Sequence, residues 1–124
     1  MNAIELARQA YAPTSFPLKS DRAIEAQLVG QMTARLRSTA QNADANYPAF
    51  VQALHDNRQM WIRLAVDVAD TDNGLPQNLR AQIFYLAEFT ELHTGKVLRD
   101  AATADALIEI NTAVLRGLNA GKGC

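Results

Sequence analysis

The chain has few of the residues that build disulfides or lipid anchors. Cys124 is the only cysteine among 124 residues, so no disulfide can form within the chain, and a reducing compartment is its natural setting. Prenylation requires three residues after the modified cysteine, and none follows Cys124. We therefore interpret Cys124 as an unpaired thiol.

Long hydrophobic runs are absent as well. No stretch approaches the roughly 18 consecutive apolar residues that a membrane span needs. The first residues, MNAIELARQAY, include Glu5 and lack the basic start and apolar run of a secretion signal. We therefore expect a cytoplasmic protein that does not bind a membrane.

The chain also lacks an excess of charge of either sign. Twelve Lys and Arg residues stand against thirteen Asp and Glu residues, which gives a formal net charge of -1. A protein that binds nucleic acid normally presents a basic face, and this sequence contains no block of Lys or Arg. We do not expect nucleic-acid binding.

The residue patterns of catalytic and metal sites are missing too. His55 and His93 fall on different expected helices and have no cysteine nearby, so they do not form a metal pair. A calcium loop with Gly74 as its glycine would have Ala69 and Arg80 as its first and last ligands, and neither can serve. With no nucleophile elbow and no phosphate-binding glycine loop, we expect no enzyme activity, metal or cofactor.

What is present is a series of helical apolar patterns, with no strand pattern or repeat. They predict a single all-α domain over residues 1–124, a small up-down antiparallel bundle of four main helices. Short connectors favour antiparallel neighbours. The expected segments are an arm and irregular stretch over 1–19, helices over 20–42, 47–69, 76–98 and 103–118, and a tail over 119–124.

The first long helix is expected to turn one apolar stripe towards the core. Ile24, Leu28, Met32 and Leu36 recur every four residues, with Val29 behind them. Later helices carry similar stripes, and Trp61 continues the stripe of helix 47–69. We therefore expect Trp61 to be a core residue.

A polar residue interrupts the apolar stripe of each of the last three helices. At one rise per residue on either side of each turn, Asn57, Thr90 and Asn111 fall at about the same height. We predict a buried polar layer of Asn57, Thr90 or His93, and Asn111, joined by hydrogen bonds. Alternatively, one or more of these side chains rotates outward to solvent.

Four motifs in the second half of the chain are together distinctive. They read NR-x-x-W-x-x-LA-x-D-x-A, N-x-LP-x-x-LRAQI, FT-x-x-HT and LI-x-IN-x-x-x-x-x-GL, and they lie between Asn57 and Leu118. In combination they resemble the bacterial flagellar biosynthesis regulator FlaF family, whereas the amino-terminal half resembles it only loosely. The family-like residues are Asn57, Arg58, Trp61, Leu64, Asp67, Asn73, Leu75, Pro76, Leu79, Arg80, His93, Thr94, Ile108, Asn111, Gly117 and Leu118.

The resemblance implies a regulator of flagellin production and export. FlaF-like proteins are required for flagellin synthesis, act beside the translational regulator FlbT and are thought to be flagellin chaperones. The implied partners are therefore flagellin and FlbT. Arg58, Arg80 and Thr94 stand off the apolar stripes, so we expect these three to be the first candidates for partner contacts.

The expected mechanism is the burial of an amphipathic flagellin segment in a groove bordered by the last three helices, with the arm Met1 to Pro17 able to move aside. Two alternatives remain. One is an adaptor that contacts FlbT or the export machinery without binding flagellin, and the other is a direct binder of flagellin messenger RNA, which the balanced charge disfavours. Because the arm can swap between subunits, the oligomeric state stays open.

Overall fold

The computed structural model describes the backbone of residues 21–122 and the side chains of residues 26–117. Within this range the chain forms four α-helices and no β-strand, which confirms the expected all-α bundle. The expected arm over residues 1–19 lies outside the described residues. The helices are α2 (Asp21–Gln41), α3 (Tyr47–Ala69), α4 (Gln77–Leu98) and α5 (Asp105–Lys122).

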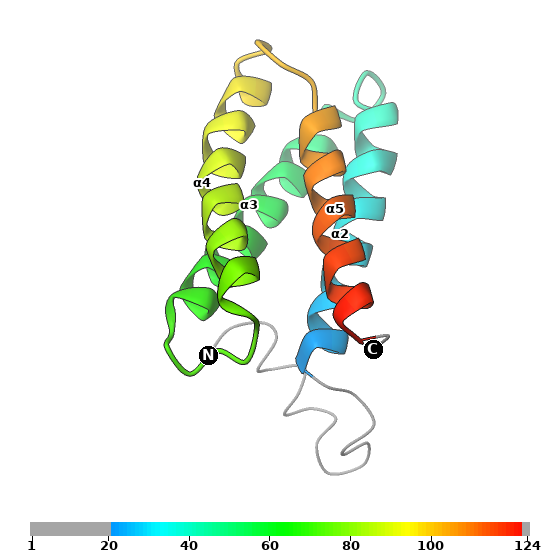
Figure 1. Cartoon of the computed structure of the whole chain (residues 1–124). Coiled ribbons are helices and arrows are strands. Elements are labelled where there is room, and N and C mark those ends of the chain that lie inside the picture. Colours follow the sequence, from blue (N-terminus) through cyan, green and yellow to red (C-terminus); the bar gives the residue numbers. More distant parts are fainter. Residues whose placement is uncertain (1–20, 123–124) are drawn as a thin grey trace.

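Each helix packs against its neighbours in the sequence, and α5 also packs against α2 to close the ring (Figure 1). In the view of Figure 1, α4 and α5 stand side by side at the front, and α3 runs obliquely behind them. The closed ring and the short connectors are consistent with an up-down arrangement.

Local hydrogen bonds define the start of α3 and the end of α4. The Asn46 side chain accepts a hydrogen bond from the Ala49 amide at 3.3 Å and caps the start of α3. Asp100 follows α4 with a φ of 60°, and the Ala101 amide donates to the Lys96 carbonyl at 2.8 Å. This left-handed ending satisfies carbonyls of the last turn of α4.

Helix α5 differs from its expected range of 103–118. It begins at Asp105, whose amide donates to the Thr103 hydroxyl at 3.4 Å, so Thr103 lies just outside the helix. It continues to Lys122 instead of ending at residue 118. Gly117 lowers helix propensity by about 1 kcal/mol but keeps its amide donor, so it does not stop the helix as a proline would.

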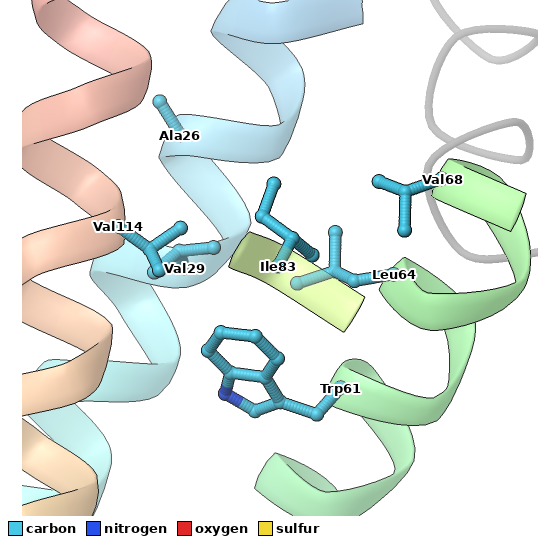
Figure 2. Packing of buried hydrophobic residues seen from close by; sticks show 7 residues of the cluster. All are labelled: Ala26, Val29, Trp61, Leu64, Val68, Ile83 and Val114. Atoms are coloured by element: carbon cyan, nitrogen blue, oxygen red, sulfur yellow. The ribbon is translucent and has the colours of Figure 1, made fainter. Parts of the chain in front are cut away.

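The core consists of two apolar clusters. One contains Ala26, Val29, Trp61, Leu64, Val68, Ile83 and Val114, and Figure 2 shows the Trp61 indole pointing from α3 into the space between the helices. The other contains Leu36, Phe50, Ala53, Leu54, Val97, Ala104 and Leu107. Trp61 is 1% exposed, as expected for a core residue.

The register of α2 differs from the expected stripe. Its buried positions include Val29, Thr33 and Leu36, whereas Leu28 and Met32 are only half-buried. Both sets have helical spacing, but Leu28 and Met32 lie on the side of α2 that borders a groove next to α3. Thr33 therefore lies in the core, whereas the stripe predicted from the sequence placed Met32 there.

Candidate functional site

A layer of buried polar side chains separates the two apolar clusters. Every helix contributes to it: Thr33 from α2, Asn57 from α3, Thr90 and Thr94 from α4, and Asn111 from α5. All five are at most 5% exposed. In each helix the polar position lies between a residue of one apolar cluster and a residue of the other.

Asn111 is the centre of the hydrogen bonds in this layer. Its Oδ1 accepts a hydrogen bond from Trp61 Nε1 at 2.8 Å, and its Nδ2 donates to Asn57 Oδ1 at 2.9 Å. Thr33 Oγ1 donates separately to the Val29 carbonyl of its own helix at 2.6 Å. The layer thus links α3 directly to α5.

Other polar atoms of the layer lack a partner. Asn57 Nδ2, Thr90 Oγ1 and Thr94 Oγ1 are buried and form no hydrogen bond with the described residues. A buried polar group without a partner costs about 1–3 kcal/mol. The layer holds only amide and hydroxyl groups and no carboxylate or imidazole, so it suits helix alignment better than proton transfer.

The structure brings Asn57, Thr90 and Asn111 into this layer but leaves His93 out of it. His93 Nε2 lies 2.9 Å from the Thr103 carbonyl, and its ring stacks on Phe89 with centroids 5.5 Å apart. His93 therefore links α4 to the connector that precedes α5.

Thr94 joins Thr90 in the layer, whereas His93, the predicted alternative to Thr90, does not. The prediction that Thr94 stands off the apolar stripe was wrong, because its side chain is 1% exposed. At 3.6 residues per turn, Thr94 lies about 40° from Thr90 on the side of Ile83, whereas His93 lies about 60° away on the other side. A buried Thr94 cannot contact a partner while the bundle is closed.

Arg80 also has a structural role that the sequence did not reveal. Its Nε donates to the Val68 carbonyl at 2.9 Å, and its Nη2 donates to the Asp70 carbonyl at 2.8 Å. These carbonyls belong to the end of α3 and to the residue after it. Arg80 thus caps α3 from α4, and its guanidinium is already occupied.

Arg58 lies at the surface and forms a two-point ion pair between α3 and α4. Its Nε donates to Glu91 Oε2 at 2.7 Å, and its Nη2 donates to Glu91 Oε1. The hydrogen bond from the guanidinium to Glu91 and the charge of Glu91 raise the pKa of Arg58 above its ordinary value. Among the three residues predicted to contact a partner, Arg58 is the one that lies beside an open surface.

That surface is an apolar groove of about 620 Å³ between α3 and α4. Its lining residues from α3 are Ile62, Ala65, Val66 and Ala69, and those from α4 are Phe84, Ala87, Glu88, Glu91 and Leu92. Leu92 is 70% exposed and Val66 is 66% exposed. Glu91 connects the groove to the Arg58 ion pair.

Helix α4 is unusual because it exposes large apolar side chains on its outer side. Phe84, Tyr85, Phe89 and Leu92 are all exposed, while Ile83 and Val97 occupy its buried side. A surface helix normally buries one apolar face and presents a polar one to solvent. Phe84 and Leu92 of this set both line the groove, and clustered exposed apolar side chains are typical of interaction surfaces.

A second groove, of about 580 Å³, lies between α2 and α3. Arg35 of α2 and Asp56 of α3 form an ion pair across it, with Nη1 and Oδ2 2.5 Å apart. Burial alone would raise the pKa of Asp56, but hydrogen bonds from Arg35 and Gln52 and the positive charge of Arg35 outweigh it. The pKa of Asp56 is therefore below its ordinary value.

The described residues contain no group of three or more His, Cys, Asp or Glu side chains placed to hold a metal ion. Among the four helices described, none is long and apolar enough to cross a membrane.

Comparison with known proteins identifies the family. No curated protein and no solved structure matches the chain significantly. The sequence profile of the family described as flagellar protein FlaF matches residues 7–118, which is most of the chain and includes the polar layer and both grooves. The chain therefore belongs to the FlaF family of flagellar proteins.

Proposed function

We propose that this protein binds flagellin in the cytoplasm as a chaperone or adaptor needed for flagellin synthesis and export, and that it acts with the translational regulator FlbT. Membership of the FlaF family supports a flagellar role. The single observation that favours flagellin binding is the exposed apolar groove between α3 and α4. The proposal is for a binding protein and not for an enzyme.

The groove suits an amphipathic helix. The terminal segments of unassembled flagellin are amphipathic and would aggregate or polymerise if they stayed exposed. Ile62 and Val66 on α3 and Phe84 and Leu92 on α4 would cover the apolar side of such a helix. The groove was expected to be bordered by the last three helices. The described groove is bordered by α3 and α4, and no residue of α5 lines it.

Titration calorimetry with purified flagellin and the full chain tests the proposal. Leu92→Glu places a charge in the groove and should weaken flagellin binding at least tenfold. Leu98→Glu is the matched control, because Leu98 lies on the same helix, is 42% exposed and does not line the groove. Its affinity for flagellin should equal that of the wild type.

Absence of any heat of binding, with the folded state of both proteins verified by circular dichroism, would contradict flagellin binding. A parallel pull-down with purified FlbT separates the adaptor alternative. Binding of FlbT without flagellin would favour an adaptor over a chaperone.

A further inference from the structure

The groove between α2 and α3 differs in chemistry from the proposed flagellin groove. Its floor includes the apolar side chains of Leu28, Met32 and Met60, and its rim includes Arg35 and Arg63. No residue of α3 lines both grooves. The two grooves therefore lie on separate sides of α3, and an occupant of one does not need the contacts of the other.

The two grooves have opposite charge. In the α2/α3 groove, Arg35 is paired with Asp56, whose Oδ1 also accepts a hydrogen bond from Gln52 at 2.9 Å. Arg63 is exposed, forms no ion pair with the residues whose side chains the structure describes, and adds a positive charge to the rim. In the α3/α4 groove the charged lining residues are Glu88 and Glu91.

The floor of the α2/α3 groove is suited to bind an apolar side chain of a partner protein. Leu28, Met32 and Met60 are half-buried, so each offers apolar surface to the groove. Methionine is unbranched and flexible, and it adapts to differently shaped apolar partners. An apolar floor with a basic rim matches an amphipathic segment that carries carboxylates beside its apolar face.

We propose that the α2/α3 groove is a second docking site, for an acidic amphipathic helix of a partner protein. Apolar residues of that helix pack on Met32 and Met60, and its carboxylates pair with Arg63, because Arg35 is already paired with Asp56. Flagellin can occupy the α3/α4 groove at the same time. This second site does not depend on flagellin binding.

Fluorescence polarisation with the full chain and two synthetic helical peptides tests the second site. The peptides share their apolar positions, and their charged positions are all Glu in one and all Lys in the other. The Glu peptide should bind at least tenfold more tightly than the Lys peptide, and its affinity should fall as salt increases.

Charge reversal identifies the groove. Arg63→Glu should weaken binding of the Glu peptide roughly tenfold and strengthen binding of the Lys peptide. Gln59→Glu adds a negative charge to the same groove with almost no change of shape and should also weaken the Glu peptide. Arg116→Glu is the matched control on the exposed side of α5 and should leave both affinities unchanged.

The second site is refuted if neither peptide binds or if both bind equally. It is also refuted if Arg63→Glu and Arg116→Glu have the same effect. Loss of Glu-peptide binding in Leu92→Glu would place the peptide in the other groove and overturn the proposal. Failure of flagellin to bind, with the Glu peptide still bound and sensitive to Arg63→Glu, would reject the chaperone function alone.

Discussion

The side-chain amides of Asn57 and Asn111 meet in a hydrogen bond of 2.9 Å that joins α3 to α5. These helices lie opposite one another in the ring, because each is flanked by α2 and α4. A hydrogen bond across the bundle fixes the axial register of one helix relative to the other. It forms only when the two helices are in register.

Replacing Asn111 should destabilise the fold more than replacing Asn57. Asn111→Leu removes the acceptor of Trp61 Nε1 and the donor to Asn57 Oδ1, so two buried groups lose their partners. Asn57→Leu deprives only Asn111 Nδ2 of its partner, and it also removes an amide nitrogen that has none. We expect the free energy of unfolding to fall by about 1–3 kcal/mol more in Asn111→Leu.

Urea denaturation of the two variants measures this difference. Each variant is the other's control, because both replace a fully buried asparagine with leucine, which has a similar shape. Equal losses of stability would show that the bond to Trp61 contributes little.

The sequence predicted the level of each polar residue along the helix axis better than the side of the helix on which that residue lies. Counting residues from each turn placed Asn57 level with Asn111, because every helical residue adds the same rise. On α4 it offered Thr90 or His93 and placed Thr94 off the stripe, whereas the structure buries Thr90 and Thr94. His93 and Thr94 differ by 100° around α4, and both follow Thr90 at helical spacing. In α2, the spacing from Val29 through Thr33 to Leu36 was the signal that Thr33 joins the layer.

Contacts that depend on turn geometry could not be predicted. The bonds of Arg80 to the carbonyls of Val68 and Asp70 require the position of α4 against the end of α3, which residue types do not encode directly. The exposure of Phe84 and Leu92 likewise depends on how far α3 and α4 separate. The sequence predicted a groove bordered by the last three helices, but the lining residues of that groove and the second groove between α2 and α3 required the folded structure.

Replacing Thr94 by Val should stabilise the protein, whereas the same change at Thr33 should destabilise it. Thr94 Oγ1 is buried without a partner, so its removal should raise the free energy of unfolding by about 1 kcal/mol. Thr33 Oγ1 donates to the Val29 carbonyl, and losing that bond should lower it by about 1 kcal/mol. Thermal or urea unfolding measures both, and a loss of stability in Thr94→Val would mean that its hydroxyl has a stabilising role.

Arg80→Met should destabilise the fold without changing flagellin binding. Methionine keeps an apolar stem but loses both hydrogen bonds to the end of α3, which should cost about 1–3 kcal/mol. Arg116→Met is the control at an exposed position of α5 and should change stability by less than about 0.5 kcal/mol. Unchanged stability together with weaker flagellin binding would instead make Arg80 a contact residue.

Acidification should remove the contribution of the ion pair between Arg35 and Asp56. The pKa of Asp56 is lower in the folded protein than its ordinary value, so its contribution is present above the unfolded pKa of about 4. That contribution is lost as pH falls through the still lower folded pKa. The stability advantage of the wild type over Asp56→Asn should therefore be largest near neutral pH and should close in acid.

The difference between wild type and Asp56→Asn should stay below about 1 kcal/mol, because the pair is partly exposed, and it should shrink at high salt. Urea unfolding from pH 7 down to about pH 3 measures it across the carboxylate range. In an Arg35→Met background the same Asp56→Asn change should have a smaller effect at neutral pH, because the hydrogen bond and the charge of Arg35 are gone. A difference that widens in acid would show that burial dominates at Asp56 and that its folded pKa is raised instead.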